Sequence, residues 1–176
     1  MRKRYIVLGL LMSVMLMGCS QNDSNVDAGN ASDTKETKIV YKQSTSNKQT
    51  DSKTKEKIEV MVDNEISLYS TENEVIKMTV ISKGNYSNAS DEHFDKVMDS
   101  IKESSAEEIK GLEFKYKEDG KTNIVESTYN LKEFSDDMEK NRLYISCGLD
   151  PEKYNENGTY PLDDLVKTLE EMGYTK

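Results

Sequence analysis

Tryptophan is absent from this sequence, histidine occurs once, and cysteine occurs only twice in 176 residues. Two cysteines exclude a scaffold held together by several disulfides. The 24 Lys and Arg residues are outnumbered by 33 Asp and Glu residues, which excludes a basic nucleic-acid-binding protein. With 35% apolar residues the chain is not a multi-pass membrane protein, and its length allows one domain plus appendages.

A single apolar run stands at the N-terminus, after a basic cluster at residues 2–4. It covers residues 5–17 and would form a helix of about 20 Å. The hydrocarbon layer of a bilayer is about 30 Å thick, so this helix is too short to cross it comfortably. A basic start followed by a short apolar core predicts a secretory signal peptide over residues 1–18.

The apolar run ends in Leu16, Met17, Gly18 and Cys19. This segment resembles the lipobox of bacterial lipoproteins, which has an aliphatic residue three positions before the cysteine and a small residue directly before it. The resemblance implies that Cys19 carries diacylglycerol on its sulfur and becomes the mature N-terminus. Two acyl chains anchor a protein stably. We therefore expect a lipid anchor on the extracytoplasmic face of the cell membrane, with an incidental cysteine in a retained helix as the alternative.

Residues 20–56 contain only six apolar side chains, and six lysines balance six acidic residues there. Such a segment buries too little apolar surface to offset the entropy lost on ordering. We interpret residues 19–56 as the lipidated cysteine with a disordered tether, and residues 57–176 as the folded domain. The patch at residues 38–42 is either a short strand that docks on the domain or an apolar spot within the tether.

Alternating apolar residues predict strands in the folded domain. The first three cover residues 58–62, 66–68 and 76–80, with a polar break at residues 63–65 and a turn at residues 71–74. A hairpin with the turn Asp119-Gly120 joins strands at residues 112–116 and 122–131, and a further strand covers residues 142–148. Short strands with tight turns favour an antiparallel sheet.

Two segments have helical periodicity. The first begins after Ser90, a favourable N-cap, and runs to Gly111 unless residues 104–105 interrupt it. The second begins at Pro161 and ends before Gly173. Each helix has one apolar face, so we expect an α+β fold in two layers: an antiparallel β-sheet of about five to six strands with two main helices on one face.

The order of these parts resembles a known family. The segments that carry the resemblance are the lipobox, the strands that end at residues 83–84, the helix before Gly111, the sequences at residues 111–116 and 124–134, and the terminal helix that ends at residues 172–174. Over residues 65–176 the chain is similar to the YehR-like lipoproteins of bacteria. The resemblance implies a small two-layer α+β fold and a lipid-anchored location, and it implies no activity.

Cys147, His93 and residues 155–158 are candidate sites. Cys147 alternates with Leu143 and Ile145, which favours a buried, inert thiol over a nucleophile or a dimer-forming thiol. His93 lies among the acidic residues of a helix start, which favours an exposed helix end over a metal site. Residues 155–158 partly match a calcium-binding loop, but the ligand register fails, so a turn is favoured.

Pairs of acidic residues occur at residues 107–108, 136–137, 163–164 and 170–171. Adjacent residues on a helix do not face each other, which favours a solvated acidic surface over a general acid–base pair. Nine tyrosines follow the signal peptide. They either line a groove or supply the core of a chain without tryptophan, and the core is favoured.

We assign no catalytic residue, no cofactor and no metal ligand, and Cys19 is the one assigned site, for lipid attachment. The expected function is a non-catalytic binding or accessory domain of the cell envelope, with a protein, peptide or small molecule as ligand and no nucleic-acid partner. The alternative is a small extracytoplasmic hydrolase that uses paired carboxylates. A purely structural role in the envelope is a third interpretation.

Overall fold

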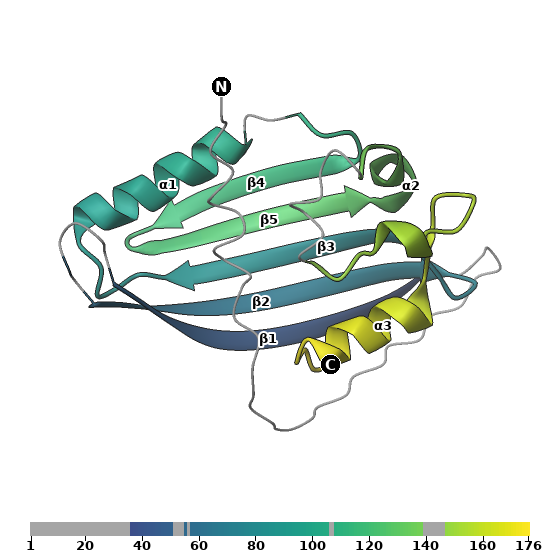
Figure 1. Cartoon of the computed structure of the whole chain (residues 1–176), viewed down its shortest axis with the longest axis horizontal. Coiled ribbons are helices and arrows are strands. Elements are labelled where there is room, and N and C mark those ends of the chain that lie inside the picture. The colour runs from purple at the N-terminus through teal and green to yellow at the C-terminus, as the bar shows by residue number, and fades with distance from the viewer. Residues whose placement is uncertain (1–35, 51–54, 56, 106–107, 139–146) are drawn as a thin grey trace.

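An antiparallel sheet dominates the computed structural model, which describes residues 36–50, 55, 57–105, 108–138 and 147–176. Its long strands lie in the order β1-β2-β3-β5-β4, and the short β6 pairs with the start of β3 (Figure 1). The strands are β1 (Thr37–Thr50), β2 (Lys57–Thr71), β3 (Glu74–Asn85), β4 (Leu112–Asp119), β5 (Thr122–Asn130) and β6 (Tyr160–Pro161). The predicted α+β fold is confirmed.

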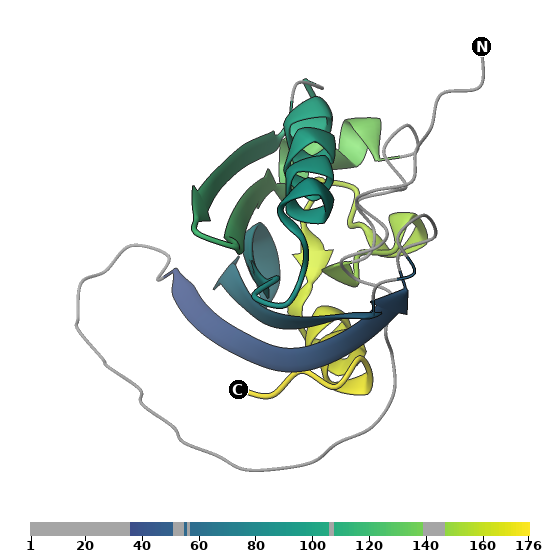
Figure 2. The ribbon, with the colours of Figure 1, turned by 90° about the vertical axis from the view of Figure 1, so that its left-hand side faces the viewer.

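The described helices lie on one face of the sheet, as Figure 2 shows. The two main ones are α1 (Asp91–Ser105) and α3 (Leu162–Glu171), and short turns of helix are α2 (Leu131–Phe134), η2 (Ser135–Asp137) and η4 (Pro151–Lys153). Alternate β2 residues form two apolar clusters with them. Ile58, Val60 and Val62 contribute to the cluster that contains α1, and Ile66 and Leu68 to the one that contains α3. Among the described helices, none has the length and apolarity needed to cross a bilayer.

The predicted disordered tether is wrong for residues 37–50, which form β1. This strand pairs with β2 along its whole length, from Thr37 opposite Ser70 to Thr50 opposite Lys57. Tyr41 is fully buried in the cluster under α3, and Ile39 packs beside it. An edge strand needs only a few apolar side chains because its partner satisfies half of its backbone, so its average composition resembles a tether. The described domain therefore begins before residue 57.

The predicted polar break at residues 63–65 is also wrong, because β2 continues through it. Asn64 occupies a position on the helix-covered face, and Asp63 and Glu65 point to the opposite face. The alternation thus continues through residues 63–65, although the buried residue there, Asn64, is polar. Ser82 of β3 lies opposite Asn64 and donates a hydrogen bond to its Oδ1 atom.

The first helix ends at Ser105, which confirms the interruption at residues 104–105 rather than a helix that continues to Gly111, and residues 108–110 are not helical. Its start is as predicted: the Ser90 Oγ atom accepts a hydrogen bond from the His93 N–H group at 3.3 Å. The end of α3 is also confirmed, since the Tyr174 N–H group donates to the Leu169 carbonyl at 3.0 Å. Most of the strand expected at residues 142–148 lies outside the described residues.

Candidate functional site

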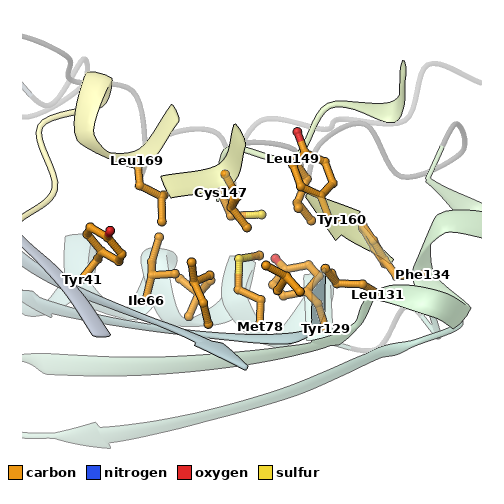
Figure 3. Close-up of a cluster of buried hydrophobic side chains, with 14 of the residues drawn as sticks. Tyr41, Ile66, Met78, Tyr129, Leu131, Phe134, Cys147, Leu149, Tyr160 and Leu169 are labelled. Carbon is orange, nitrogen blue, oxygen red and sulfur yellow. The ribbon is translucent and has the colours of Figure 1, made fainter. Parts of the chain in front are cut away.

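Cys147 lies in the larger core cluster and is fully shielded from solvent, as predicted. Figure 3 shows its side chain near Leu169 and Leu149, above Met78 of the sheet. Burial raises the pKa of the Cys147 thiol to about 12, although hydrogen bonds, one of them with Tyr129, lower it in part. A thiol with this pKa is protonated at neutral pH, and only the thiolate is nucleophilic. Cys147 is therefore a core residue.

The tyrosines divide between the core and the surface. Five of them are buried, which confirms the core interpretation for Tyr41, Tyr86, Tyr129, Tyr160 and Tyr174. Tyr154 packs perpendicular to Tyr160 at 5.2 Å between ring centroids. Tyr116 and the half-buried Tyr69 reach the surface, and the Lys77 Nζ atom lies 4.0 Å from the Tyr69 ring centroid. Tyr144 lies outside the described residues.

His93 is half-buried in the first turn of α1 rather than fully exposed. Its neighbour Asp91 forms an ion pair with Lys121 at 3.0 Å, and Asp95 is exposed. Within the described ranges, no group of three or more His, Cys, Asp or Glu side chains is placed to hold a metal ion. The helix start thus acts as a capped and ion-paired end.

The described acidic residues lie at the surface, and no Asp or Glu in the described ranges is buried. Asp136 forms an ion pair with Lys110 at 2.7 Å, and this contact lowers the pKa of the Asp136 carboxyl. Asp163 accepts a hydrogen bond from the Asn73 side chain at 3.2 Å, and Glu171 pairs with Lys167. These contacts favour the solvated acidic surface, and Glu107 lies outside the described residues.

The segment at residues 155–159 is held by a carboxylate from the start of β3. Glu74 accepts hydrogen bonds from the Asn157 amide at 3.0 Å and the Thr159 hydroxyl at 2.8 Å. These two bonds lower the pKa of the Glu74 carboxyl. The Gly158 N–H group donates to the Asn155 carbonyl at 2.9 Å, as in a turn. Protein donors thus surround the carboxylate, and the turn interpretation is confirmed.

A polar row crosses the helix-covered face of the sheet between the two apolar clusters. Asn64 and Ser82 are buried partners in it, and Gln43 of β1 donates through Nε2 to the Met172 carbonyl at 2.6 Å. In the next row, the Asn123 Oδ1 atom accepts a hydrogen bond from the Gly84 N–H group at 3.0 Å. These neutral groups tie neighbouring strands in register, because a shifted strand would leave them buried without partners.

The opposite face of the sheet, called the outer face here, is not covered by the described helices (Figure 2). Cross-strand pairs hold its side chains in ordered rows. Ser44 donates to Asp63 at 2.6 Å, and Lys115 pairs with Glu126 at 3.7 Å. Partly exposed apolar side chains lie among the charges at Val40, Met61, Ile81 and Ile124, and Met61 is 46% exposed. This surface is the candidate functional site.

Sequence reasoning missed this surface because the strand limits were too short. With β2 divided at residues 63–65 and β1 placed in a tether, the rows across five strands cannot be assembled. The one signal was the regular spacing of lysines and acids along residues 57–65, which a continuous strand places on one face.

Comparison with known proteins supplies no family. No family model matches the chain, and no curated protein matches it. A protein from Streptococcus pneumoniae TIGR4, solved by NMR, is similar in structure at a TM-score of 0.44 and 11% sequence identity, over 92% of this chain and 98% of that one. This likeness is too distant to carry a functional argument. The resemblance to the YehR-like lipoproteins stays a prediction.

Proposed function

We propose that this chain is a lipid-anchored, extracytoplasmic lipoprotein whose domain is a non-catalytic binding or accessory module of the cell envelope. Cys19 is the attachment site for diacylglycerol. The outer face of the sheet is the binding surface. The observation that carries the proposal is this exposed face, which presents ordered charged rows with apolar side chains between them.

Two further features support a binding role over catalysis. The thiol of Cys147 is buried, and its raised pKa removes it as a nucleophile at neutral pH. Paired catalytic carboxylates need a shared environment that separates their pKa values. The described carboxylates are instead at the surface. Among them, side-chain donors lower the pKa of the Glu74 carboxyl, and the contact with Lys110 lowers the pKa of the Asp136 carboxyl.

The anchor is tested by replacing the lipobox cysteine. Cys19→Ser should release the protein from the membrane fraction or leave it unprocessed, and the intact mass of the wild-type protein should include the acyl chains. Cys147→Ser is the matched control, because the Cys147 thiol is buried. This variant should stay with the membrane fraction. Unchanged mass and membrane retention of Cys19→Ser would overturn the proposal.

The binding surface is tested by crosslinking in cells. A photo-crosslinking residue placed at Ile124, on β5 of the outer face, should form adducts whose yield reaches a plateau as the expression level rises. The same residue at Lys96, on the exposed side of α1, should not. Equal crosslinking from both positions would contradict a binding role for the outer face.

A further inference from the structure

The charge of the domain is divided unequally between its two sides. The outer face has eight lysines and seven acidic residues, a net charge of +1. Its lysines are Lys38, Lys42, Lys48, Lys57, Lys77, Lys83, Lys115 and Lys117, and its acids are Glu59, Asp63, Glu65, Glu74, Glu113, Asp119 and Glu126. The other described residues have nine lysines and nineteen acids, a net charge of −10.

Most of the excess acid lies on the helices and the segments between them. The helix α1 alone has five acidic residues against two lysines, and α3 has four against one. These helices lie on the face of the sheet opposite the outer face (Figure 2). Among the described residues, the outer face is therefore the positive side and the helical face is the acidic side.

We infer that the outer face docks on the anionic phospholipid head groups of the bilayer that holds Cys19, an inference that rests on the lipid anchor of the proposed function. An anionic membrane attracts nearby lysines and repels acids, within a screening length of about 8 Å at physiological salt. The electrostatic energy of such a domain is therefore lowest when the outer face is turned to the lipid and the helices are turned away.

The position of the anchor permits this contact. Thr37, the first residue of β1, lies at the edge of the sheet and follows Cys19 by 18 positions, so even a fully extended segment spans at most about 65 Å. The partly exposed Met61 lies opposite Asn85, one row away from Lys83. It can reach the head-group region while the lysines contact phosphates.

Amine labelling of the mature lipidated protein tests this orientation. The protein is reconstituted into phosphatidylcholine vesicles, or into vesicles that also contain phosphatidylglycerol, and labelled lysines are located by mass spectrometry. We expect labelling of Lys83 and Lys117 to slow by roughly tenfold on the anionic vesicles, because the field there favours the face with positive charge. Lys96 and Lys167 on the helices should label equally on both, and high salt should remove the difference.

Charge-reversal variants separate this effect from general attraction. Lys83→Glu with Lys117→Glu makes the outer face net negative and should abolish the slower labelling of Lys57 on anionic vesicles. Lys96→Glu with Lys167→Glu changes the total charge equally but should retain it.

Two results would overturn the inference. One is equal labelling of the outer face on both kinds of vesicle. The other is that soluble polyphosphate slows the labelling of the outer-face lysines whereas the vesicles do not. Failure of the anchor itself is distinguishable, because the protein would then lack the acyl mass and would not sediment with vesicles.

Discussion

Tyr41 tests whether β1 is an integral part of the domain. Its side chain is fully buried in the cluster that contains α3, and Ile66 of β2 is its cross-strand partner. Truncation of a buried aromatic side chain to alanine costs about 3–5 kcal/mol, from lost transfer energy and the cavity left behind. For a domain of this size, that loss lowers the Tm by about 10–20 °C. If residues 37–50 were a tether, Tyr41→Ala would cost nothing.

Urea denaturation followed by circular dichroism measures this cost directly. Tyr116→Ala is the matched control, because it deletes the same atoms from an edge strand where the side chain is 37% exposed, and we expect at most about 1 kcal/mol. Tyr41→Phe keeps the ring and should also stay within about 1 kcal/mol. A Tyr41→Ala variant whose free energy of unfolding lies within about 0.5 kcal/mol of the parent would refute the placement of β1.

Two other predictions follow from backbone geometry and from buried phenols. In the same denaturation assay, Gly111→Ala should destabilise the domain by about 3 kcal/mol and Gly120→Ala by only about 1 kcal/mol. Both glycines have positive φ, but an added Cβ atom meets the Phe134 backbone at Gly111 and open space at Gly120. Equal losses would contradict the contact. Burial raises the pKa of Tyr174 to about 12, so its contribution to stability is complete below pH 10 and is lost as pH rises towards 12. Tyrosinate absorbance should therefore rise together with unfolding, and free ionisation of every tyrosine in the folded protein would contradict this.

Local patterns were reliable where the physical cause is local. Ser90 caps α1, the Asp119-Gly120 turn joins β4 to β5, and the end of α3 is where Gly173 predicts it. Each of these features depends on backbone geometry within a few residues. The burial of Cys147 was also predictable, from its apolar alternation with neighbouring residues.

Errors arose where a partner distant in sequence supplies the stabilising contact. Asn64 looks like part of a polar break until Ser82 is found opposite it. The polar segment at residues 42–50 looks disordered until β2 pairs with it. Average side-chain composition predicts no strand for either segment, because it does not include the backbone hydrogen bonds made with neighbouring strands.

The sequence alone determined the acidic net charge and the α+β class, which follow from composition and periodicity, and its lipobox-like segment predicts lipidation at Cys19. Only the tertiary structure decided that residues 37–50 belong to the sheet and that the charge is divided between two faces. Long-range strand pairing sets which alternate residues share a surface, so a mildly acidic chain becomes a molecule with a positive sheet face and a strongly acidic helical face.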